Sequence, residues 1–590
     1  MGPAWTQPPL RPLSRLGPHK QELERAKPKK KAKAKAKGAG SRKGRKTGAQ
    51  AQTPLSSTAA SASAHNYLKN GVVLANPAGR HPIYELIENA EREWEGMLHR
   101  QSKSLDEAVA EYERRYGRRP PKGFDRWWDY VETHDVLLPD EYDQIHEDLE
   151  PFWAIPPELL QDIQYAWEAA PDTYTLGRYG NWKGAGVTIV NDTLRDATFE
   201  KQIRGSREIT ALLKDVQEFI PPFRAVFSTA DGPSLLSSWR LREEAKKTVQ
   251  AGKYLDIADL PPHEDIGWLS ACAPTSPARA VADAFALAPL NTTANRTRAF
   301  VHAPLRASDP CQHPSLLTSH SAFLAHGKGP ALPDPRLVPQ FSCATTGAHA
   351  DVVAVGYQGT GSGDDEVPAV EWEEKLDGSR DDEGNGRLFW RGGPACAGEA
   401  WCGAAQRARL VKLRDGGGAV MVANATGWGT AEVEAGGGGL LDVRFADRPM
   451  DARELARHKF AMDVDGGGEQ EAGFKRLLAS GAVVLRSTVR RAWFERRMVS
   501  WVHYVPVQND YSDVLDVMAF FTGLGGDAQV AEKDALAKRI AEHGKEWTRR
   551  MWRKEDLTAY LFRLFLEYAR LMSVEREKMD FEDIENEWRR

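Results

Sequence analysis

Long apolar segments are absent from this sequence. No stretch of its 590 residues approaches the roughly 18 to 20 consecutive apolar residues that a membrane-spanning helix needs. The N-terminus likewise lacks the apolar core of a secretory signal peptide. We therefore expect no membrane span in this chain.

Cysteine is also scarce. No Cys-x-x-Cys pair and no histidine–cysteine cluster at zinc-binding spacing occurs, so we expect no structural metal. An odd number of cysteines leaves at least one thiol unpaired. The five are Cys272, Cys311, Cys343, Cys396 and Cys402.

The chain has little net charge. A formal charge of -4 gives no reason to expect polyanion binding by the protein as a whole. The basic residues gather instead in one low-complexity run, KPKKKAKAKAKGAGSRKGRK, at residues 27–46. Such a run cannot bury a core and is predicted to be disordered, whether it acts as a nuclear localisation signal, a nucleic-acid-binding arm, a juxtamembrane stem or a solvated tail. With the Ala/Ser-rich linker that follows, it defines a disordered segment at residues 1–65.

The rest of the chain is long enough for more than one domain. Residues 66–180 are predicted to be a helical extension, in which Ser104 and Glu107 form a capping box and Pro120 and Pro121 end the helix. An aromatic cluster follows that can stack on a sugar or pack a helix pair, and we favour packing. Its members are Phe124, Trp127, Trp128 and Tyr130.

Short apolar strands alternate with helical segments over residues 181–375, which indicates a parallel sheet covered by long loops at 267–347. A second α/β unit is predicted at 376–545 and a C-terminal helix at 546–590. One face of that helix carries Leu557, Leu561, Leu564, Phe565, Tyr568, Leu571 and Met572.

The most informative segment is residues 459–513. It reads as a strand (460–464), a loop with Gly466, Gly467 and Gly468, a helix (472–479) and another strand (482–485). A glycine-rich turn lets the backbone approach a phosphate, and the helix N-terminus, Lys475 and Arg476 add positive charge. The pattern is typical of a nucleotide diphosphate site, although glycine in such a loop can serve for turning alone.

The strings KFAMDVDG, GFKRLLASGAVVLRST, WVHYVPV and DYSDVLDVMAFF resemble the C-terminal half of the fungal capsule-associated transferases of glycosyltransferase family 90. That family also contains animal protein O-glucosyltransferases, which use UDP-sugars. The resemblance extends upstream through RLFWRG, VPQFSCATTGAHAD, GWLSACAPTSPAR and PKGFDRWWDYV to about residue 81. It implies an α/β protein of GT-B fold, with two Rossmann-like domains and a central cleft.

The resemblance also implies a function. It predicts an inverting glycosyltransferase that moves xylose or glucose from a UDP-sugar to a glycan or protein hydroxyl, most like the capsule-associated xylosyltransferases. Two alternatives stay open: a catalytically degenerate relative that binds glycans or proteins, and a nuclear protein that binds nucleic acid through its basic tail. We expect a UDP-sugar and a glycan or glycoprotein acceptor as partners, and no nucleic acid.

Candidate residues follow from the family's motifs. Asp196 begins an Asp-x-x-Phe string before a helix and is the predicted base, with Asp192 as the alternative. An aspartate at 196 can equally cap a helix or pair with Arg195. On the acceptor side the resemblance suggests Asp231, His349 and Asp351. On the nucleotide-sugar side it suggests Arg391, Gly392, Gly466, Gly468, Lys475 and Arg476.

The sequence departs from the family in the glycine loop. Family members carry an arginine that contacts the diphosphate where this chain has Gly473, and the loop here adds Glu469 and Glu471. Losing one charge-assisted contact costs about 1.5 to 3 kcal/mol, or roughly tenfold to a hundredfold in affinity or rate. The small hydroxyl residues usual after the Arg391-Gly392 pair are also replaced, and the chain continues with Gly393, Pro394 and Ala395.

Asp463 and Asp465 form an Asp-x-Asp pair, which in other transferases holds Mn²⁺ against UDP. Because the pair follows a strand and leads into the glycine loop, as in the metal-independent family, we expect no Mn²⁺ there and no cofactor.

The resemblance places the protein in the Golgi or secretory lumen. Fungal members usually start with a signal-anchor, so its absence predicts a truncated N-terminus or a protein that has left the secretory pathway. Cys272, Cys311 and Cys343 fall in family-like strings and could include one luminal disulfide. Four Asn-x-Ser/Thr sequons also fit a luminal protein. They begin at Asn191, Asn291, Asn295 and Asn424.

Overall fold

The computed structural model describes residues 64–179, 186–194, 203–230, 232–256, 267–281, 283–285, 298–329, 334, 336–356, 367–375, 387–394, 396, 398–424, 427–434, 439–446, 451–466, 470–523 and 529–582. The chain divides into two units, Met1–Ala62 and Ser63–Arg590, and all described residues belong to the second. Nearly all of the predicted tail therefore lies outside the described residues.

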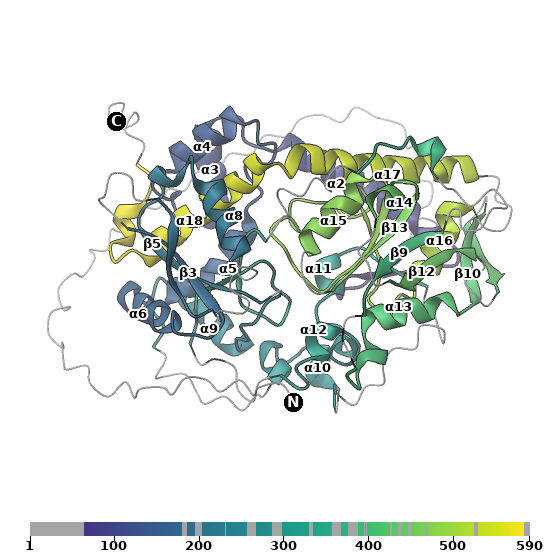
Figure 1. The fold of residues 1–590 in the computed structure, drawn as a ribbon, viewed down its shortest axis with the longest axis horizontal. Helices are drawn as coiled ribbons and strands as arrows, with labels where there is room; N and C mark the ends of the chain where they lie inside the picture. Colours follow the sequence, from purple (N-terminus) through teal and green to yellow (C-terminus); the bar gives the residue numbers. More distant parts are fainter. Residues whose placement is uncertain are drawn as a thin grey trace, which may run out of the picture. The chain divides into compact units, whose positions relative to one another are not determined.

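The first sheet is mixed rather than purely parallel (Figure 1). Its order is β4-β3-β5-β7-β8, and β5, β7 and β8 run parallel as expected, whereas β3 is antiparallel to both neighbours. The connection between β3 and β4 is shorter than the dozen or so residues that a parallel crossover requires, so the two strands pair antiparallel. The strands are β3 (Thr173–Arg178), β4 (Thr188–Asp192), β5 (Phe223–Ser228), β7 (Gln340–Ser342) and β8 (Val352–Val353).

Helix α3 (Leu105–Tyr116) begins and ends where the local chemistry predicts. In α3 the Ser104 hydroxyl accepts from the Glu107 backbone N–H at 3.3 Å, and a Glu107 carboxylate oxygen accepts from Lys103 N–H at 2.8 Å. The helix closes on Gly117 with a φ of 67°, just before the two prolines. The helices are α2 (Pro82–His99), α3 (Leu105–Tyr116), α4 (Phe124–Thr133), α5 (Asp143–Leu149), α6 (Pro157–Trp167), α8 (Arg204–Leu213) and α9 (Trp239–Gln250).

The aromatic cluster of α4 packs inside the protein. Phe124, Trp127 and Trp128 are buried, and the Trp127 indole N–H donates to the Ala559 carbonyl at 3.0 Å. These three enclosed rings cannot stack on a sugar, so the packing interpretation is confirmed for them, and Tyr130 packs partly buried against the same core.

The second sheet is entirely parallel, in the order β12-β9-β13-β14-β15, drawn in green in Figure 1. The strand predicted at 460–464 is confirmed, and the predicted helix 472–479 and strand 482–485 shift by one or two residues at their ends. The strands are β9 (Leu388–Gly392), β12 (Leu441–Phe445), β13 (Phe460–Val464), β14 (Val483–Ser487) and β15 (Val505–Pro506); the helices are α13 (Gln406–Arg414), α14 (Ala452–Ala456), α15 (Gln470–Ala479), α16 (Val514–Thr522) and α17 (Val530–Met551).

Smaller elements fill the connections. A three-stranded sheet joins β1 (Asn66–Tyr67), β2 (Val72–Leu74) and β6 (Ala299–Val301), and a hairpin of β10 (Gly418–Asn424) and β11 (Gly427–Val433) is inserted before β12. The predicted loops at 267–347 contain short helical turns, among them η5 (Gly267–Ala271), α10 (Pro277–Ala280), α11 (Pro304–Ala307) and α12 (Ser321–Leu324).

The last long helix, α18 (Lys554–Met572), packs against the first sheet. The rings of Phe565 and Phe223 stack with centroids 4.5 Å apart, and the Tyr568 hydroxyl donates to the Arg224 carbonyl at 3.0 Å. All seven residues of the predicted apolar face are buried, and so are most of the other residues of α18. Its buried charged side chains pair within the helix, since Arg563 and Arg570 both contact Glu567. No described helix is long and apolar enough to cross a membrane.

Asp148 on α5 makes stability depend on pH. Its carboxylate accepts from the Val353 backbone N–H at 2.9 Å and from the Gln144 amide at 2.6 Å. Burial raises the pKa of Asp148 to about 7, well above its value in an unfolded chain. Because the unfolded state loses this proton first, the group lowers the free energy of unfolding as the pH rises from about 4 to about 7.

Asp148→Asn carries no charge and should lack this pH dependence. We expect the free energy of unfolding of Asp148→Asn, minus that of the wild type, to be about 2 kcal/mol higher at pH 8 than at pH 5. The Gln144 amide can rotate to accept from the new side-chain NH₂. Urea unfolding at both pH values measures the effect, with exposed Asp162→Asn on α6 as the control. Equal pH dependence in Asp148→Asn and the wild type would contradict the assignment.

Candidate functional site

The second sheet changes its winding direction between β9 and β13. β12 follows β9 in the chain and lies on one side of it, whereas β13, β14 and β15 continue on the other side. In open parallel sheets, ligands bind outside the carboxyl ends of the strands at such a point. Here β9 ends at Gly392, and Asp465 and Gly466 follow β13. These strand ends define the candidate site.

Arg407 on α13 connects the two strand ends. Its Nε donates to the Asp465 carbonyl at 3.0 Å, and its Nη1 donates to the Gly393 carbonyl at 2.9 Å. The guanidinium lies 5.7 Å from the centre of the Trp390 ring. A Cβ added to Gly466 would overlap its Nη2 and Cζ atoms, so glycine is required at 466 for this arrangement.

Asp465 fixes the start of the glycine loop. Its carboxylate accepts from the Thr488 hydroxyl at 2.6 Å and the Val489 backbone N–H at 2.8 Å, and lies 3.1 Å from His320 Nε2. Burial opposes ionisation, but these donors hold the pKa of Asp465 well below its ordinary range. Burial lowers the pKa of His320, and its Nδ1 accepts from Ala322 N–H, so the neutral ring presents Nε2–H to the carboxylate.

Asp463, two residues earlier, has a different partner. It pairs with Arg486 of β14 at 3.1 Å, and the same guanidinium pairs with Glu495 at 2.8 Å. Burial raises the pKa of Asp463 to about 7 and that of Glu495 above its ordinary value. The two aspartates of the Asp-x-Asp pair are thus held by separate side chains. Among the described residues, no group of three or more His, Cys, Asp or Glu side chains could hold a metal ion.

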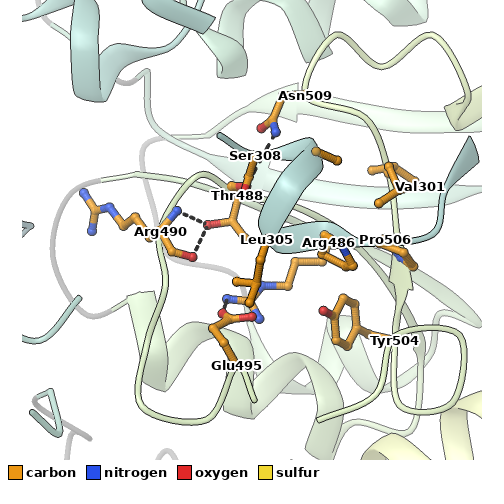
Figure 2. Close-up of a pocket in the computed structure, with 13 residues that line it drawn as sticks. Val301, Leu305, Ser308, Arg486, Thr488, Arg490, Glu495, Tyr504, Pro506 and Asn509 are labelled. Atoms are coloured by element: carbon orange, nitrogen blue, oxygen red, sulfur yellow. Dashed lines mark hydrogen bonds and ion pairs between the residues drawn. The ribbon is translucent and has the colours of Figure 1, made fainter. Parts of the chain in front are cut away.

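A cavity of about 20 Å³ opens beside Arg486, between α11 and the ends of β14 and β15 (Figure 2). This volume accommodates about one water molecule and is far too small for a sugar. Figure 2 shows the Arg490 guanidinium pointing away from the other lining residues.

Arg490 and Arg491 reach the first sheet. A Cβ added to Gly232, which follows β5, would lie 3.4 Å from Arg490 Nη2. Thr345, which follows β7, exchanges backbone hydrogen bonds of 2.9 and 2.8 Å with Arg491. The carboxyl ends of β5 and β7 therefore meet the segment that follows β14.

A third contact involves β8 and the N-terminal turn of α15. A Cβ added to Gly356, which follows β8, would lie 2.8 Å from a Glu471 carboxylate oxygen. Each parallel strand of the first sheet thus ends against the segments that follow β13 or β14. The carboxyl edges of the two sheets face one another.

His349 and Asp351 lie in this region and are both buried. His349 Nδ1 is 2.7 Å from the Thr346 hydroxyl, and the ring is 5.3 Å from that of Trp268. Burial, aided by nearby positive charge that includes Arg490, lowers the pKa of His349 to about 3, so the ring is neutral at physiological pH.

Asp351 shapes the loop that follows β5. Its carboxylate accepts from the Leu235 N–H at 3.0 Å, from the Ser234 N–H and from the Gln340 amide at 2.8 Å. Burial raises the pKa of Asp351 to about 6. Both side chains form hydrogen bonds with other groups of the protein. An acceptor-side role for His349 and Asp351 therefore stays a prediction.

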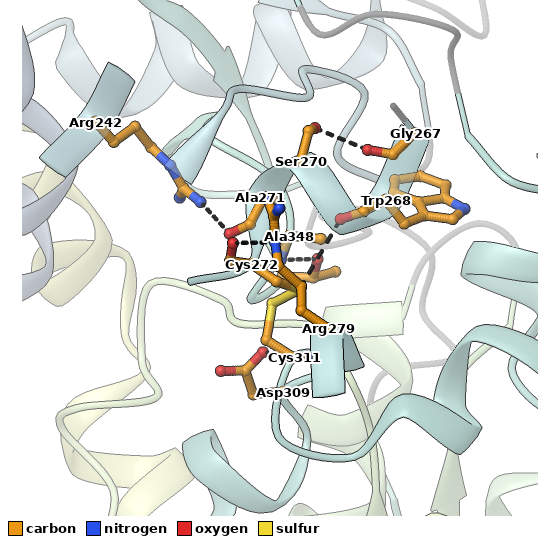
Figure 3. The surroundings of a disulfide bond; sticks show 11 residues. Arg242, Gly267, Trp268, Ser270, Ala271, Cys272, Arg279, Asp309, Cys311 and Ala348 are labelled. Carbon is orange, nitrogen blue, oxygen red and sulfur yellow. Dashed lines mark hydrogen bonds between the residues drawn. A yellow bond between two sulfur atoms is a disulfide. The ribbon is translucent and has the colours of Figure 1, made fainter. Parts of the chain in front are cut away.

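A disulfide joins Cys272 to Cys311 beside this region (Figure 3). It connects the end of η5, which carries Trp268, to the segment after α11, and Arg279 donates to the Cys272 carbonyl at 2.9 Å. The expectation of one disulfide among Cys272, Cys311 and Cys343 is therefore confirmed. A second disulfide, Cys396–Cys402, was not foreseen.

Arg391 was predicted to bind phosphate, but in the structure its guanidinium is paired with another protein group. Its Nη2 is 2.6 Å from the Asp442 carboxylate, and its Nη1 donates to the Asp442 carbonyl at 2.7 Å. The guanidinium also contacts the Phe389 ring, on the face of the sheet opposite to Trp390. A diphosphate would have to displace Asp442 to reach it.

The structure places some of the other sequence-predicted residues, and the rest lie outside its described part. Lys475 and Arg476 are half-buried on α15, and the Lys475 ammonium is 6.0 Å from the Trp552 ring centre. Gly392 and Gly466 lie at the strand ends. Asp196, Asp231 and Gly468 fall outside the described residues, and the alternative base Asp192 is exposed at the end of β4.

Sequence reasoning missed Arg407, Arg490 and His320. Arg407 belongs to QRARLVKL, whose charge pattern gives a weakly amphipathic helix and no motif. Its contact with Asp465 depends on α13 crossing the ends of β9 and β13, which spacing along the chain does not reveal.

Comparison with known proteins points to one family. Residues 333–587 match the model of Glycosyl transferase family 90. Human protein O-glucosyltransferase 1 is 32% identical over 103 residues, which are 17% of this chain and 24% of the human protein. Zebrafish (Danio rerio) protein O-glucosyltransferase 2 is 27% identical over 121 residues, 20% of this chain and 22% of the relative.

O-glucosyltransferase rumi of Drosophila pseudoobscura pseudoobscura is 29% identical over 90 residues, 15% of this chain and 20% of the relative. The aligned part spans about a quarter or less of each of these relatives.

Proposed function

Because residues 333–587 match the model of Glycosyl transferase family 90, we propose that the protein is an inverting glycosyltransferase. It moves xylose or glucose from a UDP-sugar to a hydroxyl group of a glycan or a protein. The observation that carries this proposal is the meeting of the two carboxyl edges, where a Cβ added to Gly232 would lie 3.4 Å from Arg490 Nη2 and Thr345 pairs with Arg491. Such a meeting supports a GT-B arrangement, with the donor on the second sheet and the acceptor on the first.

The proposed chemistry requires two features. Asp196 takes the proton of the acceptor hydroxyl, whose oxygen attacks the anomeric carbon while the bond to UDP breaks. Positive charge at the strand ends of β9 and β13 receives the departing diphosphate. We propose that no metal takes part, because Asp463 is paired with Arg486 and Asp465 with His320.

A location in the secretory pathway, such as the Golgi, is part of the proposal. The two disulfides support it, because such bonds persist in oxidising compartments.

Gly473 provides the test. A Cβ added there meets no atom within 4 Å, so an arginine can be introduced without a clash at its base. We expect Gly473→Arg to raise kcat/KM for UDP release from UDP-xylose or UDP-glucose by about tenfold to a hundredfold, because it restores one charge-assisted phosphate contact. Gly473→Gln is the matched control, since it adds a side chain without charge.

The same assay distinguishes an active transferase from the second candidate function, a catalytically degenerate family member, which the missing arginine favours. If the wild type releases no UDP and Gly473→Arg does, the protein is a degenerate family member that binds glycans or proteins. No release from either protein, with either donor, would refute a transferase that uses these sugars.

A further inference from the structure

The two disulfides among the described residues differ in exposure. Cys272 and Cys311 are buried, with 1% and 6% of their surface exposed, and Figure 3 shows the residues packed around them. Cys396 and Cys402 are only half-buried, and the loop that they close is exposed at residues 398–400. A reductant in solution therefore reaches the Cys396–Cys402 pair more easily than the buried bond.

The Cys396–Cys402 pair closes a loop in the connection between β9 and α13. The two cysteines are separated by 6 residues in the sequence, after the end of β9 at Gly392 and before the start of α13 at Gln406. A disulfide removes chain conformations from the segment that it closes. This bond therefore limits the movement of the connection that leads from the candidate site to the helix.

Gln406 joins the end of this connection to the candidate site. Its side-chain NH₂ donates to the Asp465 carbonyl at 2.9 Å and to the Ser321 hydroxyl at 2.8 Å, and its side-chain oxygen accepts from the Ser321 backbone N–H at 2.9 Å. Gln406 is buried and lies close after the turn η8 (Cys402–Ala404). Movement of that turn is therefore passed to the residues at the end of β13.

From this placement we propose that the Cys396–Cys402 pair is a site of thiol–disulfide exchange with a dithiol reductant, and that its reduction weakens the binding of UDP at the strand ends. The closed pair suits the oxidising compartment of the proposed function, so the transferase is fully active only there. The inference rests on the proposed function, because it names a regulation of the same site.

The dithiol supplies everything that the exchange requires. One of its thiolates attacks a sulfur of the pair, the S–S bond breaks, and the other cysteine leaves as a thiolate that takes a proton. The second thiol of the reductant then releases the first cysteine from the mixed disulfide. In this two-electron reaction the pair becomes a dithiol and the reductant becomes a disulfide.

Millimolar dithiothreitol applied to the purified full chain tests the proposal. Alkylation with iodoacetamide and peptide mass mapping should find Cys396 and Cys402 modified, while Cys272 and Cys311 stay paired. Equilibrium dialysis with UDP should then show an affinity about tenfold lower than that of the oxidised protein, because the connection is no longer held. Amide hydrogen exchange of residues 398–409 should also become faster.

A variant without the bond repeats the test without a reductant. Cys396→Ser combined with Cys402→Ser should bind UDP as weakly as the reduced wild type, and dithiothreitol should not change that affinity. Cys343→Ser is the matched control, because Cys343 belongs to neither disulfide, and it should keep the wild-type ratio of affinities between the oxidised and reduced protein. Thermal unfolding shows whether each variant is folded, and the wild-type comparison decides the question where one is not.

The outcomes separate this inference from the function on which it rests. If the wild type with reduced Cys396 and Cys402 binds UDP as tightly as the oxidised protein, the pair does not regulate the site, whereas a UDP-dependent function stands. Reduction of Cys272–Cys311 before Cys396–Cys402 would also overturn the inference. If the oxidised wild type neither binds UDP nor releases it from a UDP-sugar, the proposed function fails and the inference fails with it.

Discussion

Asp196→Asn is expected to slow sugar transfer by about a hundredfold to ten-thousandfold, because an amide cannot take the proton of the acceptor hydroxyl. Asparagine has nearly the same size as aspartate, and the residue is not expected to contact the diphosphate. The affinity for UDP should therefore stay unchanged. A fall in turnover without a change in UDP binding distinguishes a base from a donor-binding residue.

Initial rates of UDP release with an acceptor, together with calorimetry, measure both quantities. Asp192→Asn is the matched control on the neighbouring strand β4, where the side chain is exposed. If Asp192→Asn lost the activity and Asp196→Asn kept it, the base would be the alternative residue. If neither changed the rate, another carboxylate would have to act.

Arg486→Met should destabilise the protein by about 3 to 5 kcal/mol. The guanidinium is buried between Asp463 and Glu495 and lies 4.0 Å from the Phe474 ring centre. Methionine keeps part of the packing but leaves two buried carboxylates without their cation. One or both must then be protonated or exposed, which costs far more than the loss of a surface ion pair.

Urea unfolding at neutral pH measures this effect. Arg549→Met on α17 is the control, because Arg549 is largely exposed and its ion pair with Glu546 should contribute little to stability. Adding Asp463→Asn and Glu495→Gln to Arg486→Met should recover much of the lost stability. Similar midpoints for Arg486→Met and Arg549→Met would contradict the account of a buried ion cluster.

Local patterns predicted much of the second sheet. The strand 460–464 and the helix that follows the glycine loop were predicted correctly to within two residues, because strand hydrophobicity and helix periodicity are encoded within short segments. The N-cap at Ser104 and the buried Phe124, Trp127 and Trp128 of α4 were predicted for the same reason, although the Glu107 carboxylate accepts from Lys103 N–H and not from the Ser104 N–H of a capping box. These features depend on neighbours in the chain.

The first sheet was predicted less well because its topology depends on a connection rather than on periodicity. Strand–helix alternation indicates a parallel sheet, yet the short link between β3 and β4 makes that pair antiparallel. Likewise, the apolar face of α18 was visible in the sequence, but its return to the first sheet was not.

The candidate site shows the same division. Motif resemblance located the strand ends at Gly392 and Gly466, since those residues adjoin recognisable strings. It could not show that the Arg391 guanidinium turns to Asp442, or that Arg407 crosses from α13 to the loop. Both depend on how β12 and α13 pack against β9.

A crystal structure of the full chain with UDP tests the central claim most directly. We expect the diphosphate to lie between the ends of β9 and β13, beside Gly466. UDP bound away from these strand ends, or no UDP at millimolar concentration, would contradict it.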